Sequence, residues 1–235
     1  ILVFEPRRRL KYSFFVSRKR EAVLEGQLDH YQVAIKDKHF LIESLEEIVS
    51  ECRRLSGERE LDALAIRVPF GGEHFDHHTL VNPHVIQALE DLVLHAPLHI
   101  PQILMLIDFC RNIFPLLPIV LVFETAFFTD LPQREYLYGL DTGLVRKWDF
   151  RRYGFHGIYH EAACSSVYSQ CQDKDRKNPP HILSLCLEAQ PELSAVNGRR
   201  PVTITSGVTP LEGIPGQTTC GEMDSSIILT LSEKK

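Results

Sequence analysis

The spacing of hydrophobic positions divides the first third of the chain into short strands and one amphipathic helix. The runs ILVF (1–4) and LKYSFFV (10–16) predict two strands around a tight turn at Glu5–Arg9. HYQVAIKD (30–37) predicts a third strand that completes a meander. Seven apolar residues recur at helical spacing between 41 and 55, which predicts an amphipathic helix.

The middle of the chain alternates buried strands with helices. LDALAIRVPF (61–70) predicts a strand that ends at a Gly-Gly turn, and the continuous apolar run PIVLVFETAF (118–127) predicts another. Asn82-Pro83 is typical of a helix start and predicts a helix to about Leu94, with a second helix from about Gln102 to Phe114. This order of elements predicts an α/β layer with parallel pairing.

The last third follows the same plan of strands and a helix, without a literal repeat. GIYHEAACSSVYSQ (157–170) predicts a helix, and the polar residues 172–180 predict a surface loop. Three short strands are then predicted at HILSLCL (181–187), ELSAV (192–196) and PVTIT (201–205). A loop punctuated by Gly and Pro (207–221) leads into an apolar final segment, SSIILTLSEKK (225–235).

Composition restricts the class of protein without identifying it. The 235 residues are 44% hydrophobic and 24% charged, as in ordinary globular proteins, and a net charge of −5 gives no reason to expect a nucleic-acid partner. Six scattered cysteines without a CxxC pair favour free thiols over zinc or a redox dithiol. The most apolar region, 100–128, is too interrupted by charges and prolines to span a membrane. A cytoplasmic location is therefore expected.

Two polar stretches of the sequence are candidates for a functional site. RRYGFHGIYH (151–160) holds two arginines, two tyrosines and two histidines in ten positions. It is either a catalytic loop or an ordinary polar cluster at the end of a strand. The basic run Arg7–Arg9 is either a solvated turn or an anion site.

Seven stretches in order resemble the acetate kinase (acetokinase) family. They are IRVPFGGEHF (66–75), APLHIP (96–101), VFETAFF (122–128), YLYGL (136–140), RRYGFHGIYH (151–160), TPLEG (209–213) and CGEMDSSII (220–228). The resemblance implies an α/β actin-like ATPase fold of the sugar kinase/Hsp70/actin superfold. It implies an N-terminal domain over 1–148 and an incomplete second domain over 149–235. Family members are longer, and they transfer phosphate between ATP and acetate with Mg²⁺.

The resemblance also assigns substrate-side roles to individual residues. Arg67 matches the arginine that holds the substrate carboxylate, whereas the residues alone favour an arginine at a strand end paired with a nearby acid. His156 matches the histidine that hydrogen-bonds the transferring phosphoryl group. His99 matches a polar pocket histidine or is an ordinary core histidine. Phe155 and Pro210 match the walls of the acyl pocket.

The positions on the nucleotide side depart from the family pattern. Glu124 stands where the family has the aspartate near the metal, which makes it the candidate Mg²⁺ residue. Thr219 replaces the second arginine, and loss of a transition-state arginine costs about 10³–10⁵ in rate. Glu188, in CLEAQP (186–191), lies in a turn that has lost the glycines of a phosphate loop.

The opening turn, FEPRRRLK (4–11), replaces a family stretch of Asn, Gly and Ser. Glu5 and Arg8 therefore occupy nucleotide-side positions, and Pro6 lacks a backbone donor. An alternative is that Arg7–Arg9 form a new phosphate clamp.

The sequence therefore supports more than one function. The first is an acetate kinase-like phosphotransferase for a small carboxylate, weak or impaired, with ATP and Mg²⁺ as implied cofactors. The alternative is an inactive pseudokinase that serves as a binding or structural subunit, and a third is a sensor of a small carboxylate or phosphate. A second copy or another protein chain is expected to cover the incomplete domain, since exposed apolar surface marks interfaces.

Overall fold

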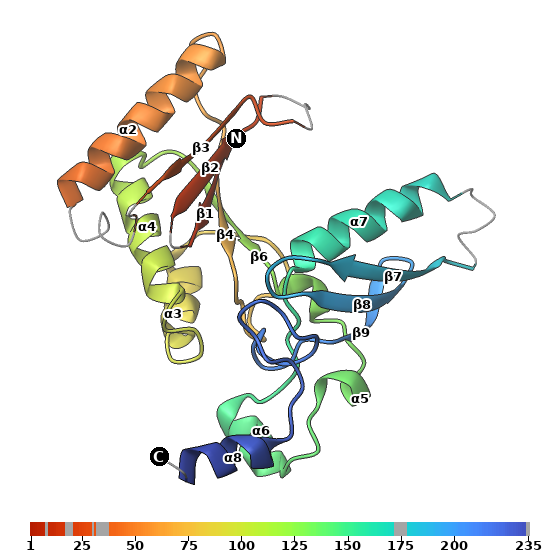
Figure 1. The fold of residues 1–235 in the computed structure, drawn as a ribbon. Helices are drawn as coiled ribbons and strands as arrows, with labels where there is room; N and C mark the ends of the chain where they lie inside the picture. The colour runs from red at the N-terminus through yellow and green to blue at the C-terminus, as the bar shows by residue number, and fades with distance from the viewer. Residues whose placement is uncertain (8, 17–20, 30, 32–37, 172–177, 234–235) are drawn as a thin grey trace. The chain divides into compact units, whose positions relative to one another are not determined.

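The computed structural model describes residues 1–7, 9–16, 21–29, 31, 38–171 and 178–233. Internal contacts divide the chain into two compact units, Ile1–Phe123 and Glu124–Lys235, and each unit is described by itself (Figure 1). The predicted domain boundary between residues 148 and 149 stays a prediction. No helix within the described ranges is long and apolar enough to cross a bilayer.

The first unit is built on a six-stranded sheet in the order β3-β2-β1-β4-β6-β5. The strands are β1 (Leu2–Pro6), β2 (Leu10–Phe14), β3 (Leu24–Leu28), β4 (Leu64–Val68), β5 (Thr79–Leu80) and β6 (Ile119–Phe123). Strands β1, β2 and β3 form an antiparallel meander, and β4 pairs in parallel with both β1 and β6. The predicted parallel layer is confirmed.

The third strand of the meander differs from the prediction. It is β3, with sequence LEGQL, whose side chains alternate between half-buried and exposed. Its glutamate and glycine hide the strand pattern because both residue types are depleted in strands. The predicted strand over 30–37 lies outside the described residues, apart from Tyr31.

The described residues of the first unit also form the helices α2 (Lys38–Leu55), α3 (Pro83–Asp91) and α4 (Ile100–Ile113). Helices α2 and α4 lie on the same side of the sheet (Figure 1). Asn82 caps α3 as predicted, because its side-chain oxygen accepts a hydrogen bond from Val85 N at 3.0 Å. The core of the unit joins β1 and β4 to α2 through side chains with no exposed surface: Leu2, Phe4, Leu41, Leu45, Leu64 and Ile66.

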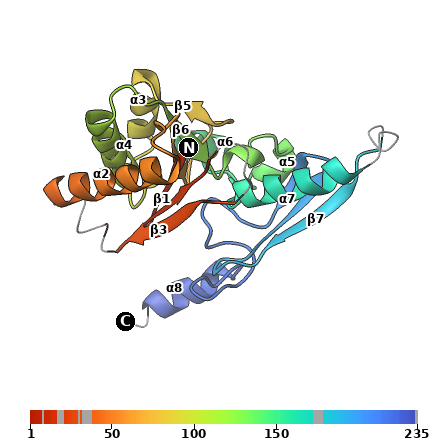
Figure 2. The same cartoon turned by 90° about the horizontal axis from the view of Figure 1, so that it is seen from above.

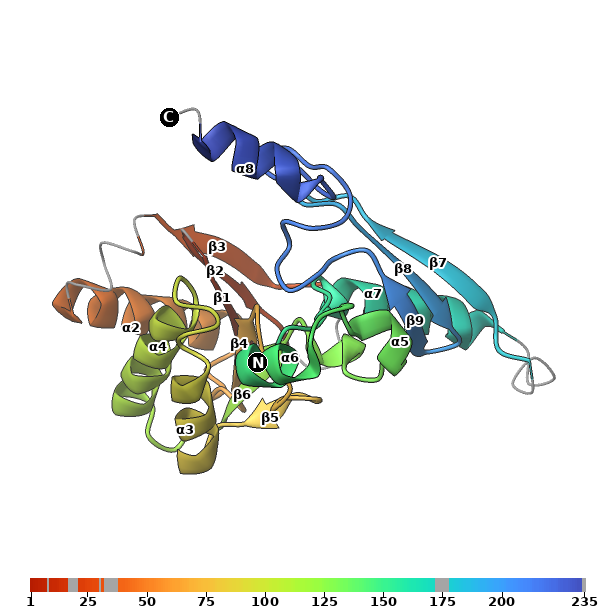
Figure 3. The same ribbon diagram turned by 90° about the horizontal axis from the view of Figure 1, so that it is seen from below.

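The second unit packs one long helix against a three-stranded antiparallel sheet. The sheet has the order β7-β8-β9, with β7 (His181–Cys186), β8 (Glu192–Asn197) and β9 (Arg200–Ile204). Helix α7 (Gly157–Gln170) lies along one face of it (Figures 2 and 3). The predicted helix over 157–170 and the three predicted strands are confirmed. The remaining elements are η1 (Ala126–Phe128), α5 (Gln133–Tyr136), α6 (Thr142–Trp148) and α8 (Ser225–Glu233).

Candidate functional site

In the first unit, Arg67 is paired with Glu5. Strands β1 and β4 run in parallel with Phe4 opposite Ile66, so the next residue of each strand points to the same side. Arg67 Nη1 donates a hydrogen bond to Glu5 Oε2 at 2.7 Å, and the two side chains are 10% and 29% exposed. The structure therefore contains the arginine–acid pair that the sequence left open for Arg67. The signal that identifies Glu5 as the partner is the parallel register, which sequence reasoning did not use.

In the opening turn, a backbone N–H is already bonded within the turn itself. Arg7 N donates to Arg9 O at 3.0 Å, and Pro6 has no N–H. Arg9 Nε lies 3.0 Å from Asp29 Oδ1, in an exposed ion pair. Arg8 lies outside the described residues. A phosphate cradle requires free backbone N–H groups that point at the ligand. Pro6 has no N–H, and the N–H of Arg7 is bonded to Arg9 O, so neither residue provides such a donor.

His99 lies immediately before α4, in the same unit. Its side chain is exposed in part, and its pKa is lowered from its ordinary value by partial burial and, to a smaller extent, by the Arg7 guanidinium. The lowered pKa favours the neutral imidazole, which can both donate and accept a hydrogen bond.

In the second unit, the backbone fixes His156 next to Glu124. Glu124 is buried and follows β6 directly, and its carbonyl oxygen accepts a hydrogen bond from Gly157 N at 3.0 Å. A Cβ on Gly157 would collide with that carbonyl, so this close approach requires glycine. The structure thus places the backbone of His156 close to that of Glu124, the candidate Mg²⁺ residue.

The conformation of His156 is unusual for a residue with a side chain. Its φ is 51°, in the left-handed region, and it forms the N-cap of α7. Both ring nitrogens are buried, and neither has a hydrogen-bond partner among the residues that the structure describes. Buried polar atoms are nearly always paired in native proteins. A strained backbone that carries an orphaned imidazole is typical of a ligand site.

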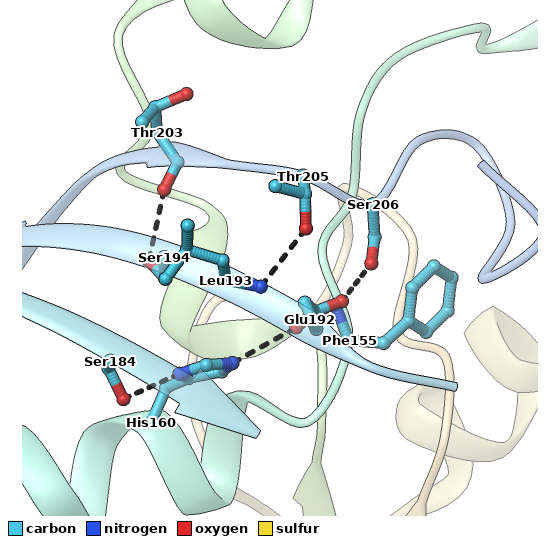
Figure 4. Close-up of polar contacts among 9 residues, drawn as sticks. All are labelled: Phe155, His160, Ser184, Glu192, Leu193, Ser194, Thr203, Thr205 and Ser206. Atoms are coloured by element: carbon cyan, nitrogen blue, oxygen red, sulfur yellow. Dashed lines mark hydrogen bonds and ion pairs between the residues drawn. The ribbon is translucent and has the colours of Figure 1, made fainter. Parts of the chain in front are cut away.

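A buried acid that sequence reasoning missed holds the loop before His156 (Figure 4). The carboxylate of Glu192, on β8, accepts hydrogen bonds from Phe155 N at 2.9 and 3.2 Å and from the Ser206 hydroxyl. His160 Nε2 lies 3.3 Å from Glu192 Oε1, within ion-pair distance. The same ring accepts or donates at Nδ1 to Ser184 Oγ, at 2.8 Å.

The chain Ser184–His160–Glu192 has the residue order of a catalytic triad, but its burial argues against catalysis. The three residues are 9%, 1% and 1% exposed. A nucleophile must reach its substrate. Ser184 is buried on the face of β7 that packs against α7, so it is not accessible to a substrate. We therefore interpret these residues as the polar link that joins the helix, the sheet and the Phe155 backbone.

The two arginines of RRYGFHGIYH have structural partners. The Arg151 guanidinium lies 4.0 Å from the centre of the Tyr136 ring. Arg152 Nη2 lies 2.7 Å from Glu212 Oε1, and Tyr138 donates its hydroxyl proton to the same carboxylate. Burial, followed by the Glu212 carboxylate, raises the pKa of Tyr138. These contacts connect the motifs YLYGL, RRYGFHGIYH and TPLEG, so the two arginines of the decapeptide are structural, whereas Phe155 and His156 remain site candidates in it.

The remaining nucleotide-side segments of the second unit lie next to each other. Gln217 N donates to Ala189 O at 3.0 Å, which joins the turn 186–191 to the segment before Thr219. Glu188 is exposed in that turn. Thr219 is buried, and its hydroxyl has no hydrogen-bond partner within the described part of the chain. Pro210 is half-buried in the loop that follows β9, and the structure shows no contact that assigns it to an acyl pocket.

Glu124 is the candidate magnesium ligand among the described residues. No group of three or more His, Cys, Asp or Glu side chains gathers at metal-binding distance in the described residues. Mg²⁺ takes one or two protein carboxylates and fills its other positions with water and phosphate oxygens. The single buried carboxylate of Glu124 therefore suits a magnesium ion that arrives with a phosphate ligand.

A family model described as the acetokinase family matches residues 10–235. Among curated relatives, an acetate kinase from Alkaliphilus metalliredigens is 35% identical over 93% of this chain and 54% of its own length. One from Clostridioides difficile is 39% identical over 75% of this chain and 44% of its own length. The chain thus spans about half the length of these relatives.

The comparison with solved structures confirms the predicted fold. A propionate kinase from Francisella tularensis aligns with a TM-score of 0.80 and 23% identity, over 99% of this chain and 63% of that one. The acetate kinase from Porphyromonas gingivalis gives the same TM-score at 24% identity, over 99% and 63% of the two chains. The fold is therefore that of the actin-like ATPases.

Proposed function

Because the chain belongs to the acetokinase family, we propose that it is an acetate kinase-like phosphotransferase of low activity. The proposed reaction moves the terminal phosphoryl group of ATP to a carboxylate oxygen of acetate, which yields acetyl phosphate and ADP. The observation that carries the proposal is the orphaned, buried imidazole of His156, on a backbone that is tied to Glu124 through Gly157. A fixed donor without a protein partner is suited to an oxygen that gains negative charge during transfer.

The proposed roles follow the chemistry of each side chain. The guanidinium of Arg67 binds the acetate carboxylate, because its planar donors match the two carboxylate oxygens. The imidazole of His156 donates a hydrogen bond to the moving phosphoryl group. Phe155 and Pro210 bound the methyl end of acetate, and His99 supplies a neutral polar contact.

Magnesium enters the proposal through Glu124. Its carboxylate would hold the ion, which when bound neutralises charge on the phosphate oxygens. The longer side chain, compared with the family aspartate, moves the carboxylate by one methylene. We expect this displacement to weaken magnesium binding, because the ion demands near-ideal octahedral geometry.

The proposal of low activity rests on the residues at the nucleotide-side positions. The turn 5–9 offers no N–H from Pro6, and the Arg7 N–H is already bonded to Arg9 O. Glu188 places a negative charge in the turn 186–191 that resembles a phosphate loop, and Thr219 supplies no positive charge. These residues do not fit a triphosphate well, so we expect weak ATP binding.

Acetyl phosphate formation tests the proposal. The chain is incubated with ATP, Mg²⁺ and acetate, and acetyl phosphate is trapped as the hydroxamate. We expect slow product formation that falls about 10²-fold in His156→Ala, as for loss of one transition-state donor. The control is His84→Ala, which changes an exposed histidine on α3 and should leave the rate unchanged. Absence of product, or an equal rate in His156→Ala, would reject the phosphotransferase.

The second candidate is a pseudokinase that acts as a binding or structural subunit. A specific observation favours it: β7 exposes Leu183 and Leu185 on the side of the sheet away from α7, and Leu187, directly after the strand, is exposed as well. A contiguous apolar strand on the surface is typical of a protein interface. This candidate predicts association with a second copy or another chain, together with no turnover in the assay above.

A further inference from the structure

The carboxylate of Glu5 is hydrogen-bonded to the Arg67 guanidinium, which is the group that binds the substrate carboxylate in the proposed function. Arg67 on β4 and Glu5 on β1 lie on neighbouring strands, and the distance from Arg67 Nη1 to Glu5 Oε2 is 2.7 Å. We propose that Glu5 occupies the carboxylate-binding position of Arg67 and competes there with small carboxylates from solution. Glu5 would then set the affinity of the first unit for its substrate. This inference rests on the proposed role of Arg67 in carboxylate recognition.

The competition follows from the same chemistry that suits Arg67 to acetate. The glutamate side chain ends in the functional group that acetate presents, so both make charge-assisted hydrogen bonds to the guanidinium. The Arg67 side chain is 10% exposed, which leaves little room for a second anion beside Glu5. A bound acetate and the observed Glu5 contact therefore exclude each other.

Strand pairing gives Glu5 an advantage over a dissolved carboxylate. Strand β1 is hydrogen-bonded on both sides, to β2 and to β4, so the Glu5 backbone is already fixed next to Arg67. The entropic cost of bringing the two charges together is thus included in folding. The apparent dissociation constant of an external carboxylate rises by the inverse of the fraction of Arg67 that is not held by Glu5.

The exposure of Glu5 makes its displacement feasible. Its side chain is 29% exposed, nearly three times the exposed fraction of Arg67, so water reaches the acid from one side. The other arginine–glutamate pairs of this unit differ. In Arg53–Glu60 the side chains are 43% and 77% exposed, and in Arg54–Glu51 they are 68% and 39% exposed. Solvated pairs of this kind offer no enclosed position for an anion.

Removal of the Glu5 carboxylate tests the inference by chemical rescue. In Glu5→Ala the buried guanidinium loses its hydrogen-bonded carboxylate, so we expect a lower thermal midpoint in chloride buffer. Sodium acetate should restore the midpoint at an ionic strength at which sodium chloride does not. Calorimetric titration should show acetate binding at least about tenfold tighter in Glu5→Ala than in the unaltered chain.

Three further variants make the result interpretable. Glu60→Ala removes the acid of the exposed Arg53 pair and should show no acetate-specific rescue. The double variant Glu5→Ala/Arg67→Ala should lose the tight acetate binding. If Glu5→Ala does not fold, Glu5→Gln keeps the side-chain volume without the charge, and acetate should bind it more tightly than it binds the unaltered chain.

Equal acetate affinity in the unaltered chain and in the Glu5 variants would overturn the inference. The outcome is separable from that of the proposed function, because it is read from binding and not from turnover. Acetate rescue without acetyl phosphate formation would reject the phosphotransferase and retain the role of Glu5. Turnover that depends on His156 but is indifferent to Glu5→Gln would do the reverse.

Discussion

At the scale of single residues, the most constrained side chain of the second unit is the carboxylate of Glu192. It is 1% exposed and contacts Phe155 N, the Ser206 hydroxyl and His160 Nε2. A buried acid is tolerated only when its oxygens are paired. Glu192 therefore stabilises the loop that presents His156, although it is not itself a catalytic candidate.

Replacement of Glu192 by alanine should strongly destabilise the chain. It leaves the Phe155 N–H and the Ser206 hydroxyl without their buried acceptor, and each buried polar group left unpaired costs about 1–3 kcal/mol. Urea unfolding measures this free energy. The matched control is Glu188→Ala, an exposed acid in the turn before β8, which should change stability by less than about 0.5 kcal/mol. Similar midpoints for the two variants would contradict the structural role of Glu192.

Residue types and motifs alone predicted the candidate residues but not their partners. His156 and Glu124 were found from motif matches, and the structure places their backbones close together. The Glu5–Arg67 and Glu192–His160 pairs join residues 62 and 32 positions apart in the sequence. Such pairs depend on strand register and on helix–sheet packing, which a single sequence does not encode in any local pattern.

At the scale of elements, the start of α7 determines the geometry of the candidate site. Gly157 is the first residue of the helix, and its N–H is bonded to the Glu124 carbonyl at the end of β6. His156, immediately before it, has a positive φ. The helix start thus serves as a close backbone junction that sets the position of the imidazole.

Gly157→Ala tests this junction. The added methyl group collides with the Glu124 carbonyl, so we expect a loss of about 1–3 kcal/mol in unfolding free energy, as for overpacking. A shifted His156 should also lower any acetyl phosphate formation. Gly139→Ala is the control, since a Cβ there meets no atom within 4 Å. A Gly157→Ala variant as stable as Gly139→Ala would show that the junction relaxes easily.

Elements with strong periodicity were predictable, and weakly patterned ones were not. Helix α7 begins and ends where the sequence predicts, and α2 begins three residues before the apolar repeat at 41–55. Strands β3 and β5 were missed because LEGQL lacks an apolar alternation and Thr79–Leu80 is only two residues long. Their pairing is imposed by the neighbours β2 and β6.

At the scale of the whole molecule, the pseudokinase candidate rests on the exposed leucines of β7 and of the residue after it. Leu183, Leu185 and Leu187 are 75%, 52% and 79% exposed, while the other face of the strand packs against α7. Burial of such a strand by another chain is favourable, since apolar area is removed from water.

We expect the chain to self-associate, with an average molar mass that rises with protein concentration. Light scattering coupled to size-exclusion chromatography measures this mass. Leu183→Lys/Leu185→Lys should remove this association without lowering the thermal midpoint, because both side chains are already exposed. The control Leu94→Lys/Leu116→Lys charges two exposed leucines of the first unit and should leave the association intact. A monomeric unaltered chain would count against the second copy as the occupant of β7.

The position of β4 between β1 and β6 has a consequence for biosynthesis. The sheet of the first unit joins residues near the start of the chain to Ile119–Phe123, so it cannot close until the ribosome has released that last strand. The meander of β7, β8 and β9, by contrast, connects only neighbours in sequence and closes within 24 residues, from 181 to 204. During translation, strands β1 to β4 therefore remain without their last partner until residue 123 has emerged, whereas β7, β8 and β9 can pair soon after they emerge.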